Sequence, residues 1–240
     1  MTRGIKRAFH WRFPLWLRNA PGKKGAAVFL LAPVAFLLPL EHSGILSSRV
    51  QSISALVWLL AMALPLSVRG QAGLRESYIL WLFQRGCGPG DVALEDWMLD
   101  LGLFFAFALW WAGAGVMALA MSHPVSPANL LSLLLLGSSV AVLTHSVTFL
   151  FSAWGSSRTS DPVAFLAFLS VLLPTLTMEF PEWVFTAADW LIPPFHSAMI
   201  LSGTVRAGLF PEAASALLHI LLYSGVAVGL GYRRMSLWRP

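Results

Sequence analysis

Long apolar runs separated by short polar segments dominate the pattern along this chain. Six of the runs are long enough to cross a bilayer core, which takes about 20 residues per helix. The predicted spans cover 26–46, 52–68, 98–121, 129–152, 162–178 and 212–232. The pattern therefore predicts an all-α, polytopic membrane protein with a single transmembrane domain over residues 1–240.

The first twenty residues have a different pattern. Basic residues, among them Arg3 and Arg7, recur at helical spacing, while Ile5 and Phe9 fall on another face. A basic amphipathic helix of this kind lies in the membrane interface rather than across the bilayer. We therefore expect an interfacial helix over 1–20.

The polar segment between the second and third spans contains a short apolar helix, predicted over 73–84. Gly86 and Gly88 follow and end it. A solvated linker would not hold Leu80 to Phe83 in an unbroken apolar row, so another surface should cover this helix. A membrane surface and a groove on a soluble partner both fit.

The segment 181–207, before the last span, is apolar but is interrupted by Pro181, Pro193 and Pro194. It is too short for two further crossings. We expect a re-entrant pair of short helices, because irregular backbone at membrane depth is tolerated where protein or a wet cavity surrounds it.

Composition supports a membrane protein and excludes other classes. Hydrophobic residues make up 57% of the chain and charged residues 11%, against roughly 25% charged in an average soluble domain. This excludes an ordinary soluble enzyme, a disordered chain and a nucleic-acid-binding domain. The single cysteine, Cys87, excludes a disulfide scaffold.

The positive charges indicate the orientation. With a cytoplasmic N-terminus, all of the 16 Lys and Arg residues except Arg49 and Arg206 fall on the cytoplasmic side. Six spans then place both termini in the cytoplasm. We expect a multi-pass protein of the cytoplasmic (inner) membrane of a bacterium.

Two local stretches carry a family resemblance. The first is Gly73-Leu74-Arg75-Glu76, followed by an apolar run and Gly88-Pro89. The second runs from Phe180-Pro181-Glu182-Trp183 through Ile192-Pro193-Pro194-Phe195-His196 to Arg206. With the span layout, these stretches resemble the permease subunit of ABC-2 type ABC transporters over nearly the whole chain.

The resemblance implies an exporter subunit that is not itself an enzyme. Two copies of a separate ATPase would hold ATP and Mg, while this chain would bind no cofactor and no metal. A second permease copy, in a homodimer, and membrane lipid are the other implied partners, without nucleic acid. The 73–84 helix would be the coupling helix that contacts the ATPase. Its contact residues would be Leu74, Arg75, Glu76, Tyr78, Ile79, Trp81 and Leu82.

Four residues are candidates for a substrate path: His145, Trp110, Glu179 and His219. Ionisable groups inside a membrane suggest function, but a neutral histidine also serves helix packing, and Glu179 also fits a membrane boundary. Trp110 faces either a cavity or lipid. In the last span, the spacing Gly225-x-x-x-Gly229, with Gly231 beyond it, permits close helix packing.

The chain lacks the phosphate-binding Gly-x-x-x-x-Gly-Lys-Ser/Thr, the His-Glu-x-x-His and the Gly-x-Ser-x-Gly motifs, which makes an ATPase, a zinc protease or a serine hydrolase improbable. Two alternatives stay open. One is a permease similar to the haem exporters of cytochrome c maturation. The other is a non-transporting membrane anchor or assembly subunit that recruits a soluble partner.

Overall fold

The computed structural model describes three continuous stretches and a scatter of single residues. The stretches are 127–154, 160–172 and 190–237, and the single residues lie between 88 and 120. Within these residues every regular element is helical and no strand is present, so the all-α prediction is confirmed there. The continuous helices are α6 (Pro127–Ala153), α7 (Ser160–Leu172), α9 (Phe195–Ala207) and α10 (Phe210–Ser236).

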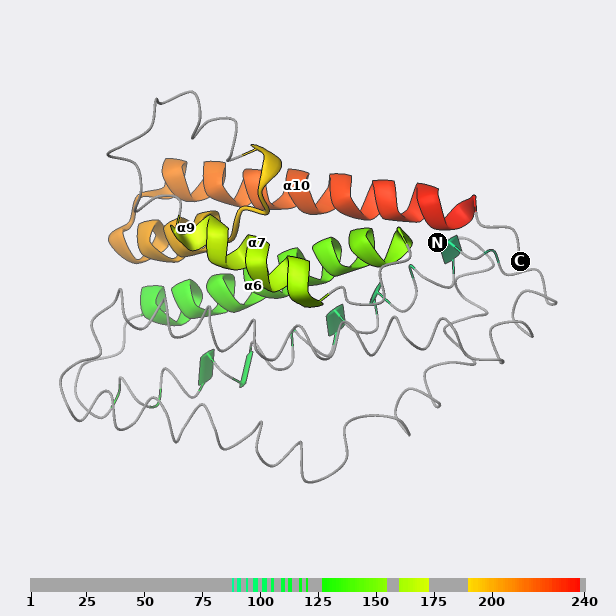
Figure 1. The fold of residues 1–240 in the computed structure, drawn as a ribbon. Coiled ribbons are helices and arrows are strands. Elements are labelled where there is room, and N and C mark those ends of the chain that lie inside the picture. Colours follow the sequence, from blue (N-terminus) through cyan, green and yellow to red (C-terminus); the bar gives the residue numbers. More distant parts are fainter. Residues whose placement is uncertain are drawn as a thin grey trace, which may run out of the picture.

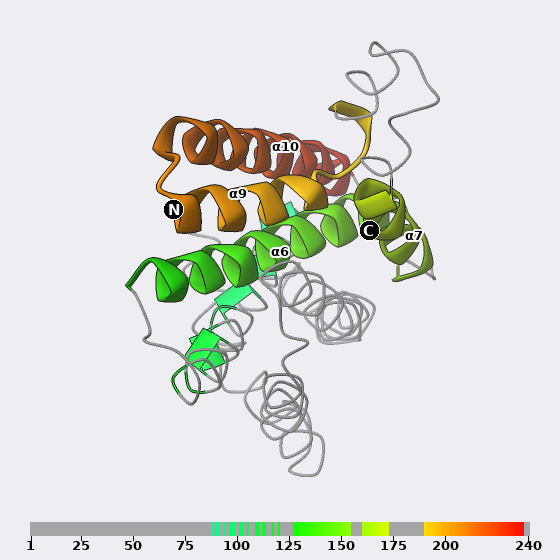
Figure 2. The same ribbon diagram turned by 90° about the vertical axis from the view of Figure 1, so that its left-hand side faces the viewer.

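α6 and α10 run side by side in the same direction, and α9 runs against both (Figures 1 and 2). At one end Ser132 of α6 meets Ser202 of α9, with their Oγ atoms 2.7 Å apart. At the other end Phe149 and Ala153 of α6 pack with Met235 of α10. Two successive helices that run in parallel need a return segment between them, and α7 runs in that return direction in Figure 1.

The turn between α9 and α10 has a clear local cause. Gly208 adopts a left-handed conformation with φ of 75°, which a residue without Cβ enters at no steric cost. The N–H of Gly208 donates to the Val205 carbonyl at 3.2 Å, and the N–H of Leu209 donates to the Thr204 carbonyl at 2.8 Å. This Schellman arrangement ends α9. Pro211 then stands in the first turn of α10, where its missing N–H leaves no helical bond unmade.

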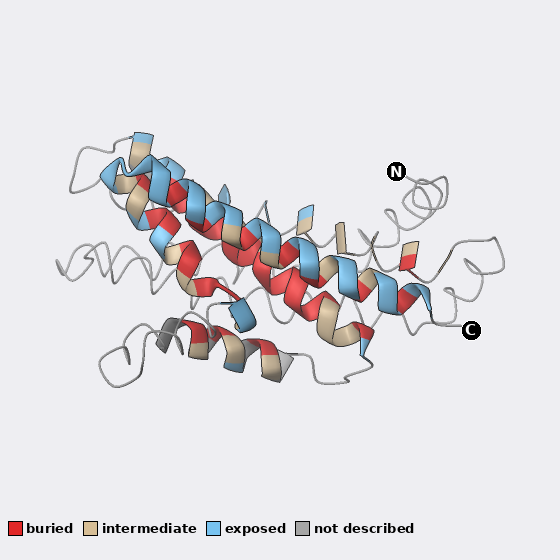
Figure 3. Ribbon diagram, turned by 90° about the horizontal axis from the view of Figure 1, so that it is seen from above, coloured by how far each residue is buried: buried red, intermediate tan, exposed pale blue. Residues whose placement is uncertain are grey.

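α6 forms the centre of the described core. Leu133, Leu136, Val140 and Leu143 are almost fully buried, and they pack with residues of α9 and α10 such as Phe195. Figure 3 shows α6 mostly buried, whereas α10 carries a long exposed face. That exposed face is apolar and consists of Leu217, Leu218, Leu221, Leu222, Val226 and Leu230.

Among the residues that the structure describes, two helices are long and apolar enough to cross a membrane: Leu130–Ala153 of α6 and Phe210–Ser236 of α10. Their bounds lie close to the predicted spans 129–152 and 212–232. α7 begins two residues before the predicted fifth span, of which the structure describes residues up to 172. Every described residue from 90 to 120, a stretch that includes the predicted third span, is helical.

Other predicted segments lie outside the described residues. These are the interfacial helix 1–20, the spans 26–46 and 52–68, the coupling helix 73–84, and the first part of the re-entrant segment, 181–189.

The glycines of α10 differ in a way that the sequence did not predict. A Cβ on Gly231 would lie 2.6 Å from Cδ1 of the buried Phe149, so α10 comes very close to α6 there. A Cβ on Gly225 or Gly229 would meet nothing within 4 Å in the described structure. The prediction of close packing therefore holds at Gly231, while no described residue packs against Gly225 or Gly229, for which it stays a prediction.

Candidate functional site

Polar side chains from three helices meet where α9 begins. Pro194 precedes α9 and offers no side-chain cap. Ser170 of α7 supplies the missing acceptor, because the His196 N–H donates to its Oγ at 3.2 Å. The same Oγ lies 3.1 Å from Nδ1 of His196. Ser170 therefore fixes both the start of α9 and one side of the His196 ring.

Ser197 connects two histidine rings from different helices. Its Oγ lies 3.4 Å from Nε2 of His196 and 3.2 Å from Nδ1 of His219 in α10. The ring centroids of the two histidines are 6.4 Å apart, in an edge-on arrangement. Ser170, His196, Ser197 and His219 thus form a continuous hydrogen-bonded chain from α7 through α9 to α10, which we call the histidine chain.

The histidine chain links the proton positions of its two rings. A neutral imidazole has one donor and one acceptor nitrogen, and Ser197 has a single hydroxyl proton to donate. If Ser197 donates to Nδ1 of His219, it accepts from Nε2 of His196, and Nδ1 of His196 then accepts from Ser170. If His219 becomes protonated, Ser197 accepts from it, and the direction of every bond reverses. A proton change at one ring therefore sets the tautomer of the other.

One ring nitrogen of His219 takes no part in the histidine chain. Its Nε2 is buried and has no hydrogen-bond partner in the described structure. Trp190, which is 65% exposed, lies against the same ring with a centroid distance of 5.3 Å. The end of the histidine chain at α10 thus presents a hydrogen-bonding nitrogen beneath an exposed aromatic side chain.

A second polar contact holds the other end of α9 against α6. Ser132 Oγ donates to the Ser202 carbonyl at 2.8 Å and accepts from Nη2 of Arg206 at 3.5 Å. Partial burial lowers the pKa of the Arg206 guanidinium, which still stays cationic because its ordinary pKa is so high. α9 is therefore fixed at both ends, by Ser170 and by Ser132.

The histidine chain does not form a metal centre by itself. Among the described residues, no group of three or more His, Cys, Asp or Glu side chains gathers closely enough to hold a metal ion. Each of its two imidazoles already has one ring nitrogen within hydrogen-bond distance of the Ser197 hydroxyl. The arrangement suits the transfer or sensing of a proton, or hydrogen bonding to a polar group of a ligand.

The structure separates two of the predicted path residues. Gly231 of α10 lies level with Leu150 of α6, because a Cβ on Gly231 would lie 3.5 Å from the Leu150 Cα. His145 is five residues before Leu150, and His219 is twelve residues before Gly231. At 1.5 Å per residue, the two histidines are therefore about 10 Å apart along the helix axes. His145 is almost fully buried and flanked by Thr144 and Ser146, whose side chains are also buried.

The remaining predicted residues are distributed as follows. Trp110 is in a helical conformation, and it is 38% exposed. Glu179 lies outside the described residues, as do the proposed ATPase contacts Leu74, Arg75, Glu76, Tyr78, Ile79, Trp81 and Leu82. The predictions for these eight residues stay predictions.

Sequence reasoning missed His196, Ser197 and Ser170 as partners of His219. The one available signal was the Pro193-Pro194 break, because irregular backbone at membrane depth often adjoins a polar site. Comparisons of the chain with protein-family models, with curated proteins and with solved structures return no match.

Proposed function

We propose that this chain is the membrane-embedded permease subunit of an ABC-2 type exporter. In this proposal it crosses the inner membrane six times, with both termini in the cytoplasm, and pairs with a second copy and with two separate ATPases. The observation that supports it best is the α9–α10 hairpin, in which a short helix folds back at Gly208 into a long one.

The length of α9 supports a re-entrant role. Its 13 residues extend about 20 Å at 1.5 Å per residue, well short of the roughly 30 Å hydrocarbon core. α10 has 27 residues and extends about 40 Å, which is enough to cross. A half-length helix held beside a full-length one is the layout that the family resemblance implies for the segment before the last span.

The direction of the helices agrees with the proposed topology. A fourth and a sixth span must run the same way, with the fifth returning between them. α6 and α10 are parallel, and α7 runs in the opposite direction (Figure 1). Under this topology the Gly208 turn faces the outside, where the charge count also places Arg206.

The exposed face of α10 supports placement in lipid. Its six large apolar side chains are exposed over about four turns of helix, between Leu217 and Leu230. A soluble protein rarely leaves so continuous an apolar surface in water. Lipid chains or a second copy of the subunit would cover it.

The histidine chain would lie within the membrane in this arrangement. His219 is nine residues into α10, about 14 Å from its start by helical rise. We propose that Nε2 of His219 contacts a polar group of the cargo on its way out, beside Trp190. ATP closure of the partner ATPases would move the coupling helix, and the spans would then rock around the site.

The direct test is co-purification. The tagged full chain is extracted in mild detergent from its native membrane, its partners are identified by mass spectrometry, and ATP hydrolysis is measured. The proposal expects a protein with a phosphate-binding loop and an ATPase activity that follows the complex. Replacing Arg75 and Glu76 together by Ala should reduce the recovery of that partner or its coupling to transport.

A matched control uses Arg233→Ala and Glu212→Ala, which change exposed charges on α10 and not on the proposed contact. Recovery of a soluble partner without any ATPase would overturn the permease proposal in favour of a membrane anchor.

A further inference from the structure

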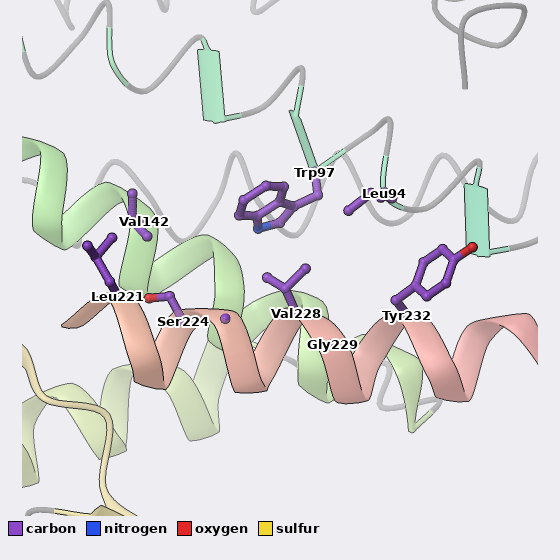
Figure 4. A pocket seen from close by; sticks show the side chains of 9 residues that line it. Leu94, Trp97, Val142, Leu221, Ser224, Val228, Gly229 and Tyr232 are labelled. Carbon is purple, nitrogen blue, oxygen red and sulfur yellow. The ribbon is translucent and has the colours of Figure 1, made fainter. Parts of the chain in front are cut away.

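A cavity of about 430 Å³ lies between α6, α10 and the helical residues around Trp97 (Figure 4). Its walls are almost entirely apolar and include Leu94, Val142, Leu221 and Val228. The volume falls within the range of about 300–1,000 Å³ that is usual for small-molecule sites. The cavity is separate from the histidine chain, whose nearest member, His219, does not line it.

Two polar atoms in the cavity wall have no hydrogen-bond partner in the described structure. They are Nε1 of Trp97 and Oγ of Ser224, both buried. Figure 4 shows the two side chains on opposite walls, with the indole nitrogen on the side that faces α10. Both atoms are covered in this structure, so a ligand oxygen would reach them when their side chains turn toward the cavity. An unsatisfied buried polar group costs about 1–3 kcal/mol, which such an acceptor oxygen would relieve.

Ser224 lacks the bond within its own helix that many helical hydroxyls make, as does Thr144 of α6. Several hydroxyl groups donate to a carbonyl of their own helix three or four residues earlier, which is the usual arrangement within helices. They belong to Ser146, Thr148, Ser152, Thr204, Ser215 and Ser236. Ser224, at 5% exposure, makes no such bond. The third polar group, Tyr232, donates its hydroxyl to Oδ1 of Asp91 at 3.2 Å.

The cavity opens on the side of the helix bundle. Gly225 and Gly229 line it and are exposed, as is Leu221. The two glycines leave space there, because a Cβ on either would meet nothing within 4 Å in the described structure. A ligand would therefore enter sideways through the exposed face of α10.

We propose that this cavity binds one apolar chain of a lipid-like amphiphile, whose oxygen accepts hydrogen bonds from Trp97 and Ser224. The lining extends along α10 from Leu221 to Tyr232, about 16 Å by helical rise, which suits one extended chain rather than a compact molecule. A carbonyl or ether oxygen fits, because Nε1 of tryptophan can only donate and a serine hydroxyl can also donate.

This inference rests on the membrane placement in the proposed function, because lateral entry needs lipid against α10. A bilayer lipid and an exported amphiphile share the required chemistry, namely an apolar chain with an acceptor oxygen near it.

The test is photocrosslinking in nanodiscs of phosphatidylethanolamine and phosphatidylglycerol. A small fraction of the phosphatidylethanolamine carries a diazirine in its acyl chain. After illumination, the full chain is washed in detergent and digested, and the crosslinked peptides are mapped. The expected result is a retained crosslink concentrated around Trp97 and on the α10 residues that line the cavity, namely Leu221, Ser224, Gly225, Val228, Gly229 and Tyr232. A crosslink on the exposed residues of α10 that do not line it would indicate the general lipid surface instead; these are Leu217, Leu218, Leu222, Val226 and Leu230.

Variants distinguish the cavity from the general lipid surface. Ser224→Ala and Trp97→Phe should each lower the retained crosslink about two- to tenfold, the effect of losing one net hydrogen bond. Gly225→Leu fills the cavity and should reduce the crosslink to background. Gly203→Leu makes the same change at an open, exposed site on α9 and should leave the yield unchanged.

Equal yields in the native chain and in Gly225→Leu would overturn the proposal. So would the absence of any retained crosslink, which would indicate a cavity that holds only water. ATP turnover by a co-purified ATPase distinguishes the two ligand sources. If the ligand is an exported amphiphile, turnover should lower the yield of crosslink. If the ligand is a resident lipid, the yield should stay unchanged. If no ATPase co-purifies, the exporter proposal fails while a localised crosslink still supports the cavity site.

Discussion

The two longest helices in the described part of the chain have the same length and similar hydropathy but opposite surroundings. α6 and α10 each contain 27 residues. In the most apolar window of each, 67% of the residues are buried in α6 and only 28% in α10. α6 alone resembles the core helix of a soluble protein. α10 is the informative helix, because its exposed apolar face needs lipid or another protein to cover it.

Polar residues also differ between the two helices. α6 buries five small polar side chains and His145, and several of them bond to their own helix or to α9. α10 places Ser224 in a cavity wall and His219 at the end of the histidine chain. α6 therefore supplies most of the buried packing surface, whereas His219 and Ser224, which belong to the two candidate sites, lie on α10.

The largest expected contrast is between two leucines. Leu136→Ala in α6 removes a fully buried side chain and should cost about 2–5 kcal/mol of unfolding free energy. Leu222→Ala in α10 truncates a side chain that is 50% exposed and should cost far less, since lipid solvates both forms. Thermal unfolding in detergent, followed by size-exclusion chromatography, measures both. Equal destabilisation would mean that α10 is as buried as α6 in the assembled protein.

The next contrast is between glycines of α10. Gly231→Ala places a Cβ against the Phe149 ring, and overpacking of this kind typically costs about 1–3 kcal/mol. Gly225→Ala enters open space and should stabilise the helix by up to about 1 kcal/mol through helix propensity. The same unfolding assay compares them, and a Gly231→Ala protein as stable as Gly225→Ala would refute the close contact.

The Gly208 turn gives a smaller effect. Gly208→Ala forces a Cβ into the left-handed region and should cost about 1–2 kcal/mol. Gly203→Ala, within α9 and without a positive φ, should be neutral or slightly stabilising. Protease resistance of the turn between α9 and α10, together with the melting temperature, reports both. A Gly208→Ala variant with unchanged melting temperature and protease resistance would indicate a longer, continuous helix in place of the hairpin.

The smallest effect is expected at the contact between α6 and α9. Ser132→Ala removes the hydrogen bonds to Ser202 and Arg206, and interhelical bonds in membranes average about 0.6 kcal/mol, with a maximum near 1.7. Ser215→Ala is the control, because its exposed hydroxyl bonds only within α10 in the described structure. A double-mutant cycle between Ser132 and Ser202 should recover the coupling, and a zero coupling energy would contradict the contact.

The sequence predicted the long helices because apolar runs of this length have few alternatives in a bilayer. α6 and α10 are the clearest examples, with bounds within a few residues of the predicted spans. The Pro193-Pro194 pair likewise marks where α9 begins, and Gly208 marks where it ends.

Contacts between segments could not be predicted in the same way. Ser170, His196 and His219 are widely separated in the chain, and their meeting depends on how the α9–α10 hairpin packs against α7. Gly231 and Gly225 lie on different faces of α10, and only the packing of the helices decides which of those faces meets α6. Periodicity shows which residues share a helix face but not which neighbour that face meets.

The most direct test of this account is side-specific labelling of the α9–α10 hairpin. The native Cys87 is replaced by Ser, and single cysteines are placed at Leu191, Leu209 or Leu237, all of which are exposed. A membrane-impermeant maleimide should label Leu209→Cys only from outside and Leu237→Cys only from the cytoplasmic side. Leu191→Cys should not react from the cytoplasm, because α9 does not cross. Cytoplasmic labelling of Leu191→Cys, or labelling of Leu209→Cys and Leu237→Cys from one side, would contradict the account.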